Sequence, residues 1–247
     1  MGLNDNVVLV TGAARRVGAE IARSLHASGA RVVVHYRSAA EQAFRLVESL
    51  NETRAGSACA HQCDLLEMGA IPDLIETAIE QFGRLDALVN NASSFFATPV
   101  GRIKESDFTD LLGSNLKAPL FLSQAAAPHL RATRGAIVNM VDIHAERPLP
   151  GFAVYTAAKA GLAGLTRALA RELAPEIRVN GIAPGAIQWP EDGAFDAGER
   201  VRIVSQTPLG RCGEPRDIAR MVRFLLDDAP YVTGQIIAVD GGRSLFL

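Results

Sequence analysis

Short apolar runs alternate along this chain with longer segments in which apolar residues recur at helical spacing. Most of the short runs are nearly continuous in apolar residues, which is typical of strands covered on both faces. Strands that alternate with helices form βαβ units and hence a parallel sheet. The sequence therefore predicts an α/β fold with a doubly wound, parallel, seven-stranded sheet and helices on both faces. The expected strands are Val7–Thr11, Arg31–Tyr36, Ala58–Cys63, Leu85–Asn90, Gly135–Val141, Ile177–Ile182 and Gln235–Val239.

The helical segments lie between these strands, and glycine follows two of them. Gly29 and Gly83 stand where a helix end often takes left-handed backbone geometry. No internal repeat, low-complexity tract or linker divides the 247 residues, so residues 1–247 are expected to form one domain. The expected helices are Arg16–Ser28, Ala39–Leu50, Met68–Phe82, Asp107–Arg131, Ala153–Leu173 and Glu214–Leu226.

One segment, residues 184–208, is rich in proline and glycine and has only a weak helical pattern. It follows a strand, at the end of the sheet where α/β proteins bind ligands. A loop of this length is uncommon unless it is functional, so we expect a substrate loop that acts as a lid. An irregular surface loop is the alternative.

The overall composition excludes several classes of protein. Hydrophobic residues make up 48% and charged residues 21%, which is typical of a folded domain. A net charge of −2 gives no basic surface for nucleic acid, and three cysteines do not make a disulfide scaffold. No apolar run approaches the roughly 18 residues of a membrane span, and no secretory signal is evident. We expect a cytoplasmic protein that binds neither nucleic acid nor membrane.

The first expected strand leads through a turn of small residues into a helix. Gly12 and Gly18 let the backbone approach a pyrophosphate, while the helix N-terminus offers unpaired N–H groups and a positive dipole end. This strand–turn–helix context predicts a Rossmann-like dinucleotide-binding site. Arg16 stands at a position where glycine is usual, so the fingerprint is imperfect.

The end of the second strand indicates which dinucleotide binds. An NAD site places a carboxylate near this point to hold the ribose 2′-hydroxyl. Here the chain reads Tyr36-Arg37-Ser38, and a guanidinium with a hydroxyl suits a 2′-phosphate, which a carboxylate would repel. We therefore expect NADPH/NADP+ rather than NAD(H). The alternative is that Arg37 is a solvated surface charge.

Polar residues also follow the third and fourth strands, where a nucleotide lies in this architecture. Asp64 comes directly after the third strand and Asn91 after the fourth. Both are expected to contact the cofactor. Side chains of these types also often hydrogen-bond their own turn, which is the alternative.

Tyr155 and Lys159 are four residues apart in one expected helix, so they share a face. A phenol is a weak acid–base catalyst at neutral pH, and a neighbouring ammonium favours the phenolate and lowers its pKa. The spacing alone occurs by chance in many helices. It becomes informative because it follows the fifth strand of a dinucleotide-binding sheet.

Over essentially its whole length, the chain resembles the short-chain dehydrogenases/reductases. The resemblance rests on Thr11–Gly18, Asn90-Asn91-Ala92, Asn115, Tyr155-x-x-x-Lys159, Pro184-Gly185 and Val239–Gly242. It implies that Tyr155 donates a proton, that Lys159 lowers the pKa of Tyr155 and binds the nicotinamide ribose, and that Asn115 supports a proton-relay water. It also implies a homotetramer built on residues 107–131 and 153–173. The expected cofactor contacts are Gly12, Arg16, Val17, Gly18, Tyr36, Arg37, Ser38, Asp64, Leu65, Asn91, Ala92, Ser93, Tyr155, Lys159, Pro184 and Gly185.

Asp142 is the departure that narrows the substrate. Most members of the family have a serine some 13 residues before the tyrosine, where it polarises the substrate carbonyl, and this chain has Asp142 there. An ionised carboxylate would destabilise a developing alkoxide. A carboxyl group can instead hold ring N–H groups or pass a proton to a ring nitrogen, which indicates a C=N bond in a nitrogen heterocycle. A role for Asp142 as a helix or turn cap is the alternative.

Asp142, Arg16 and two further runs, residues 35–41 and 91–96, together resemble the pteridine reductases, a branch that reduces pterins and folates with NADPH. This implies that Phe95 stacks on the pterin, that Arg16 reaches pterin and cofactor phosphates, and that Ser93 touches both ligands. Physical reasoning alone leaves Phe95 equally a core side chain under a loop. The expected substrate contacts are Arg16, Ser93, Phe95, Asp142, Tyr155 and Trp189, the last in a run similar to bacterial members.

The expected function is NADPH-dependent reduction of a pterin of the dihydrobiopterin, dihydromonapterin or dihydrofolate class, with a proton donated through Tyr155. Two alternatives stay open: a carbonyl reductase of 3-oxoacyl thioesters or other ketones, and a non-catalytic NADPH-binding sensor. Cys59, His61 and Cys63 alternate along one strand. We expect them to be packed by helices and to bind no metal, because structural zinc sites favour paired cysteines in turns.

Overall fold

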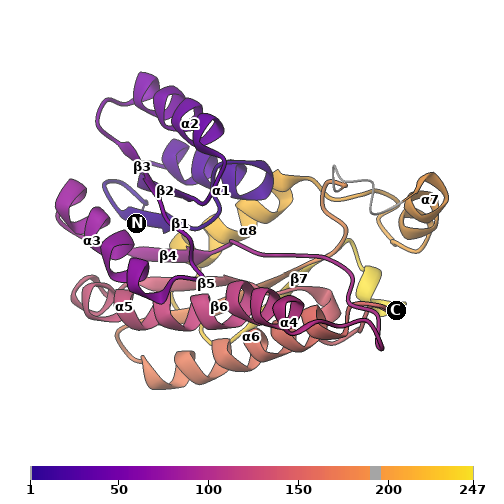
Figure 1. The fold of residues 1–247 in the computed structure, drawn as a ribbon. Coiled ribbons are helices and arrows are strands. Elements are labelled where there is room, and N and C mark those ends of the chain that lie inside the picture. The colour runs from indigo at the N-terminus through magenta and orange to yellow at the C-terminus, as the bar shows by residue number, and fades with distance from the viewer. Residues whose placement is uncertain (1, 190–195, 247) are drawn as a thin grey trace.

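A parallel seven-stranded sheet forms the centre of the computed structural model, which describes residues 2–189 and 196–246 (Figure 1). Its strand order is β3-β2-β1-β4-β5-β6-β7, and every neighbouring pair is parallel, which confirms the predicted fold class. The order changes direction between β1 and β4, where a doubly wound sheet forms a ligand-binding crevice. The strands are β1 (Val7–Val10), β2 (Arg31–Tyr36), β3 (Ala58–Gln62), β4 (Ala87–Asn90), β5 (Ala136–Met140), β6 (Arg178–Pro184) and β7 (Ile236–Val239).

Helices cover both faces of this sheet (Figure 1). Helices α1, α2 and α8 pack on one face, and α3, α5 and α6 pack on the other. Helix α4 continues towards α5 and packs on α6. The helices are α1 (Arg16–Ala27), α2 (Ala40–Thr53), α3 (Ile71–Phe82), α4 (Glu105–Leu112), α5 (Ala118–Thr133), α6 (Ala153–Glu172), α7 (Ala197–Ser205) and α8 (Pro215–Asp227).

The central strands are apolar throughout because successive side chains enter different hydrophobic clusters. Val8 and Val10 of β1 pack with the layer of α1 and α8, while Val7 and Leu9 pack with the layer of α3 and α5. All four side chains are completely buried. A strand buried on both faces has no polar face, which explains the continuous apolar runs in the sequence.

The prediction of one helix over residues 107–131 is wrong. The structure has α4, then a π-helical turn η2 (Gly113–Lys117), then α5. Pro119 is the physical reason, since it has no N–H to donate to the carbonyl four residues earlier, and the register of hydrogen bonds changes there. The helical periodicity of the sequence is continuous across this segment and does not reveal the one extra residue of the π-helical turn.

Other element boundaries differ from the predictions by small amounts. The helix expected from Met68 begins as a 3-10 turn, η1 (Met68–Ala70), before α3. Strand β6 extends two residues further than expected, to Pro184, because it pairs with β7 as far as Val239. No helix among the described residues is long and apolar enough to cross a membrane.

The predicted substrate loop, residues 184–208, is described except for residues 190–195, which lie outside the described part of the chain. Helix α7 lies within it and begins with a capping box in which Asp196 accepts from the N–H of Glu199 at 2.8 Å. That capping pattern was the signal for a helix in this loop. Helix α7 and the C-terminal 3-10 turn η4 (Arg243–Leu245) lie at the same end of the molecule (Figure 1).

Candidate active site

The turn between β1 and α1 is held in shape from two neighbouring strands. Gly12 has φ of +61°, and a Cβ there would lie 3.0 Å from the Cα of Ala92. The side-chain amide of Asn91 donates to the carbonyls of Thr11 and Gly12, at 2.8 and 3.2 Å. Asn91 therefore braces the turn at the end of β1 rather than its own turn. Only glycine fits at position 12 without moving this support.

His35 supports the same turn from β2, and the sequence analysis did not single it out. The N–H of Gly12 donates to His35 Nδ1 at 3.1 Å, so Nε2 carries the ring proton and donates to the carbonyl of Cys63 at 3.2 Å. Burial lowers the pKa of His35 to about 4, which keeps the ring neutral near pH 7. A histidine inside an otherwise apolar buried strand was the feature of the sequence that could have indicated this supporting role.

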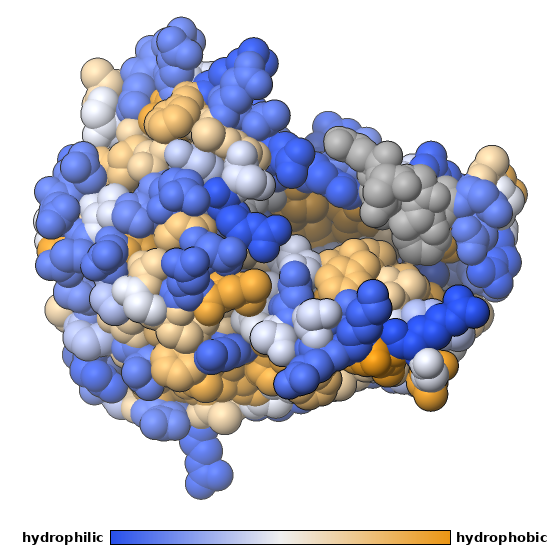
Figure 2. Space-filling model, viewed as in Figure 1, coloured by the Kyte–Doolittle hydropathy of each residue, from blue (hydrophilic) through white to orange (hydrophobic). Residues whose placement is uncertain are grey.

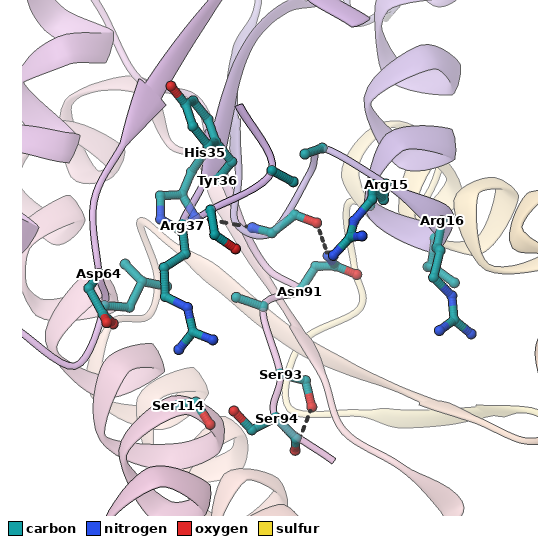
Figure 3. A pocket seen from close by; sticks show the side chains of 18 of the residues that line it. Arg15, Arg16, His35, Tyr36, Arg37, Asp64, Asn91, Ser93, Ser94 and Ser114 are labelled. Atoms are coloured by element: carbon teal, nitrogen blue, oxygen red, sulfur yellow. Dashed lines mark hydrogen bonds between the residues drawn. The ribbon is translucent and has the colours of Figure 1, made fainter. Parts of the chain in front are cut away.

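A cavity of about 410 Å³ opens over this turn (Figure 3). Arg37 reaches in from the end of β2 on the side of Asp64, and Arg16 projects on the opposite side. The expected cofactor residues that line the cavity are Gly12, Arg16, Val17, Gly18, Tyr36, Arg37, Ser38, Asp64, Leu65, Asn91, Ala92 and Ser93. Lining residues that the sequence analysis missed are Ala14, Arg15, His35, Ala39, Leu66, Ser94 and Ser114.

The other expected cofactor residues, Tyr155, Lys159, Pro184 and Gly185, do not line this cavity. Pro184 ends β6, and a Cβ on Gly185 would lie 2.7 Å from the Cα of Asp240. Asp64 lines the cavity but accepts a hydrogen bond from the N–H of Leu66 at 2.9 Å, so it also stabilises its own turn.

Asp142, Tyr155 and Lys159 form a polar cluster beyond the end of β5. The Tyr155 hydroxyl donates to Asp142 Oδ2 at 2.7 Å. The other oxygen, Oδ1, accepts from the N–H of His144 at 2.8 Å and caps the 3-10 turn η3 (Ile143–Ala145). Lys159 Nζ donates to the carbonyl of Met140 at 2.8 Å and lies 5.6 Å from the centre of the Tyr155 ring. Asp142 is thus both a cap and a partner of the tyrosine.

The expected direction of the Tyr155 pKa shift is wrong in this structure. Burial and the Asp142 carboxylate raise the pKa of Tyr155 well above 10, and the Ser93 hydroxyl opposes them only in part. Burial also lowers the pKa of Lys159 to about 8, against the attraction of Asp142. The phenol is consequently held in its protonated form, because burial and the neighbouring carboxylate both disfavour the phenolate.

Asn115 lies in the π-helical turn and fixes the loop after β4 that carries Ser93. Its amide nitrogen donates to the carbonyls of Ser94 and Leu111, both at 2.9 Å, and its oxygen accepts from the Ser93 hydroxyl at 2.6 Å. The side chain is completely buried. Widened turns of this kind often occur at functional sites. Here the turn brings a helix residue against the loop after β4.

Phe95 belongs to a small apolar cluster that borders Tyr155. Its ring stacks on Phe152, with centroids 4.7 Å apart and planes at 13°, and meets the Tyr155 ring edge-on at 4.9 Å. Phe95 itself is only half-buried. Phe95 therefore packs on the protein and also lies beside the phenol, and its stacking on a pterin stays a prediction.

Arg16 connects the start of α1 to the loop after β6. Its guanidinium donates to the carbonyl of Gln188 at 2.7 Å and to that of Trp189 at 3.4 Å. Its φ is +54°, in the left-handed region that favours glycine. Arg16 therefore has the backbone geometry expected of the glycine that usually stands at this position of the fingerprint. The Trp189 ring in turn lies 5.6 Å from the guanidinium of Arg200 on α7.

Cys59 on β3 and Cys63 directly after it pack in the hydrophobic core, and His61 contacts α3. His61 Nδ1 lies 2.7 Å from the hydroxyl of Thr77, and burial raises the pKa of both Cys59 and Cys63 to about 11. Within residues 2–189 and 196–246, no group of three or more His, Cys, Asp or Glu is arranged to hold a metal ion.

The family model described as Enoyl-(Acyl carrier protein) reductase matches residues 12–244, which is most of the chain. The chain belongs to the short-chain dehydrogenase/reductase family. It is accordingly an oxidoreductase that uses NAD(P). The glycine turn with its cavity and the Tyr155–Lys159 pair are both features that suit this chemistry.

Relatives of this family member carry names from two substrate classes. Pteridine reductase 1 of Leishmania tarentolae is 40% identical over 97% of this chain and 96% of its own length. A 3-oxoacyl-(acyl-carrier-protein) reductase of Staphylococcus aureus is 39% identical over 95% of this chain and 96% of its own. An uncharacterized oxidoreductase of Methylorubrum extorquens is 38% identical over 97% and 98%. Because these identities are so similar, the comparisons do not distinguish the two substrate classes.

Proposed function

We propose that this protein is an NADPH-dependent pteridine reductase that adds a hydride to a pterin ring carbon and a proton to the neighbouring nitrogen. The observation that carries this proposal is the 2.7 Å hydrogen bond between Tyr155 and the carboxylate of Asp142. A serine hydroxyl would suit a developing alkoxide at this position, whereas a carboxylate destabilises one. A C=N nitrogen, unlike a carbonyl oxygen, is basic enough to take up a proton before the hydride arrives, so no anion needs to form on the substrate beside Asp142.

Residues around the cavity suit NADPH. Gly12, Gly18 and the N-terminus of α1 would hold the pyrophosphate. Lys159 lies outside the lining of this cavity, and the family resemblance implies that it would bind the nicotinamide ribose. Arg37 is exposed at the cavity, and the chain reads Tyr36-Arg37-Ser38 at the end of β2, where an NAD site would carry an acid. The Arg37 guanidinium would hold the 2′-phosphate through paired hydrogen bonds. When bound, the reduced nicotinamide supplies the hydride.

Proton delivery is assigned to Tyr155. Because its pKa lies well above the usual value, the phenol carries a proton to donate near pH 7. Loss of that proton leaves a phenolate next to Asp142, and the ammonium of Lys159, 5.6 Å from the ring, offsets this charge. Asp142 would also accept N–H groups of a pterin ring, and Phe95, beside Tyr155, would form the wall opposite the nicotinamide.

A second candidate is reduction of 3-oxoacyl thioesters, which the similarity to the staphylococcal reductase favours. It requires an alkoxide-like transition state beside a carboxylate, and for that reason we place it second. A third candidate, an NADPH-binding sensor, has no use for the buried Tyr155–Lys159 pair.

The test compares NADPH oxidation with 7,8-dihydrobiopterin, 7,8-dihydrofolate and acetoacetyl-CoA as substrates. We expect kcat/KM for at least one pteridine to exceed that for the thioester by about 100-fold, the scale set by one misplaced group at the reacting oxygen. Turnover of the thioester alone would assign the second candidate. NADPH binding without turnover of any substrate would favour the sensor.

A further inference from the structure

A second cavity, of about 530 Å³, lies at the end of β7 and, among the described residues, shares no lining residue with the cavity over the glycine turn. Its walls come from the loop after β6, the residues that follow α7, the first turns of α8 and the turn after β7. Figure 2 shows the molecule hollowed between its body and the segment that carries α7, with apolar colour on the floor and hydrophilic colour along the rim. Cavities of this size accommodate small organic ligands.

Apolar side chains line this second cavity without filling it. Leu209, which follows α7, is 69% exposed, and Ile187, Met221 and Val239 are half-buried. The N–H of Leu209 donates to the carbonyl of Gly241 at 3.1 Å, so the backbone of the leucine is fixed beside the turn after β7. A ligand with an apolar body would remove this surface from water, which is favourable.

The charged side chains at the cavity differ in how they are paired. Arg211 Nη1 donates to Asp217 Oδ2 at 2.8 Å, so these two charges neutralise each other. The two oxygens of Asp240 accept from N–H groups of the turn η4, at 2.9 and 2.8 Å. Arg220, one turn after Asp217 on α8, is exposed and makes no ion pair or hydrogen bond with the residues that the structure describes. Its guanidinium is therefore available to an anion.

These features indicate one class of ligand. An apolar body suits Leu209 and its apolar neighbours, and one anionic group suits Arg220. A carboxylate carries a single charge and matches a guanidinium through paired hydrogen bonds. A doubly charged phosphate would be repelled more strongly by the carboxylates of Asp217 and Asp240, which also line the cavity.

The wall of this cavity is joined to the active site through the loop after β6. Ile187 pairs with Gly213 in a short parallel bridge, in which the N–H of Gly213 donates to the carbonyl of Ala186 at 2.9 Å and the N–H of Gln188 donates to the carbonyl of Gly213 at 3.2 Å. A Cβ at Gly213 would lie 2.2 Å from Ile187 Cδ1, so the isoleucine side chain packs directly on this glycine. The carbonyl of Gln188 in turn accepts from Arg16 at 2.7 Å. A ligand that packs on Ile187 therefore contacts the segment that holds Arg16.

We propose that the second cavity is an effector site for a monocarboxylate with an apolar body, which places its carboxylate on Arg220 and its body on Leu209 and Ile187. The bound ligand fixes Ile187 and with it the carbonyl of Gln188. Arg16, which lines the cavity over the glycine turn, is thereby kept in place, and binding of the dinucleotide cofactor becomes tighter.

Calorimetric titration of the NADP+-saturated protein with decanoate tests the site. In Arg220→Gln we expect the Kd of decanoate to rise about tenfold, because one charge-assisted hydrogen bond is lost, and Arg220→Lys should recover most of the affinity. Leu209→Asp, at an exposed position, should abolish binding because it places a like charge beside the carboxylate. Arg23→Gln is the matched control and should bind decanoate like the wild type, since Arg23 is an exposed arginine of α1 that lines neither described cavity.

Decanol and decyl phosphate separate the classes of ligand. Decanol lacks the charge and decyl phosphate carries a second one, so both should bind more weakly than decanoate. Decanoate binding that is unchanged in both Arg220→Gln and Leu209→Asp would overturn the site. Displacement of NADP+ by decanoate would also overturn it, because the ligand would then lie in the cavity over the glycine turn.

Fluorescence titration with NADPH tests the effector role. Saturating decanoate should lower the Kd of NADPH about fivefold, and saturating NADPH should lower the Kd of decanoate by the same factor, because coupling between two binding sites is reciprocal. In Arg16→Ala the coupling should disappear, since the link through Gln188 is removed. A Kd of NADPH that does not respond to decanoate, or an equal response in Arg16→Ala, would overturn the effector role.

Discussion

At the scale of single residues, Asp142 is the side chain on which the proposed function rests. Its two oxygens do different work: one caps η3 through the N–H of His144, and the other holds the Tyr155 hydroxyl. The cap fixes the carboxylate without a partner cation within ion-pair distance among the described residues. A single substitution at this position should therefore change the chemistry with little effect on the fold.

We expect Asp142→Ser to lower kcat/KM for the pteridine by about 100-fold and to raise turnover of acetoacetyl-CoA. Serine keeps the capping preference of the position, so stability should fall by less than about 1 kcal/mol. Steady-state kinetics with both substrates and urea unfolding check these outcomes. A variant that retains full pteridine turnover would remove Asp142 from the reaction.

The proposed contact between Arg37 and the 2′-phosphate predicts that Arg37 sets the preference for NADPH over NADH. In Arg37→Gln we expect KM for NADPH to rise about tenfold or more while KM for NADH stays nearly constant, because only NADPH carries the phosphate. The ratio of the two values within one variant is its own control. An equal change for both cofactors would return Arg37 to the role of a solvated surface charge.

At the scale of elements, the sequence predicted what local pattern determines and missed what depends on distant contacts. The strands were predictable because residues such as Val8 and Leu9 are apolar on both sheet faces. The interruption before α5 was missed although Pro119 marks it in the sequence, because the helical periodicity continues through it and the π-helical turn also involves contacts of Asn115 with Ser94 and Ser93, more than 20 residues away. The glycine turn and the Tyr155–Lys159 pair were found from spacing. The upward pKa shift of Tyr155 required the observed burial and the contact with Asp142.

Arg16 tests how α1 and the loop after β6 are joined. Both Arg16→Ala and Arg16→Gly remove the hydrogen bonds to Gln188 and Trp189, but only glycine suits φ of +54°. We expect the glycine variant to be more stable than the alanine variant by about 1 kcal/mol, while both lose substrate affinity to the same extent. Urea unfolding and KM measured side by side check this. Greater stability of the alanine variant would contradict the left-handed geometry at this residue.

At the scale of the whole molecule, stability should depend on His35. Its pKa is about 4 in the fold and 6.5 ordinarily, so the unfolded chain binds the proton more readily. The contribution is therefore present above pH 6.5 and lost as the pH falls towards 4. We expect the free energy of unfolding to fall by about 3 kcal/mol more in the wild type than in His35→Gln across this range. If urea unfolding gave the same pH dependence of the free energy of unfolding for the wild type and His35→Gln, this linkage would be excluded.

Assembly is also a property of the whole molecule, and we propose a homotetramer. Phe108 on α4 and Leu120 on α5 are exposed at 50% and 37%, on the helices expected to form the subunit contacts. Exposed apolar side chains on neighbouring helices are typical of an interface. Light scattering after gel filtration should give about four times the mass of one chain. A monomer at micromolar concentration would contradict this assembly.

The most direct test of the account is a crystal structure of the protein with NADP+ and a 2-amino-4-oxopteridine. We predict that the pterin ring lies parallel to Phe95 on one side and to the nicotinamide on the other, with an Asp142 oxygen within hydrogen-bond distance of a ring nitrogen. The Phe95 ring would then stack on the pterin and not on Phe152 alone. A complex in which Phe95 stays stacked on Phe152 and Asp142 contacts only Tyr155 and His144 would contradict the account.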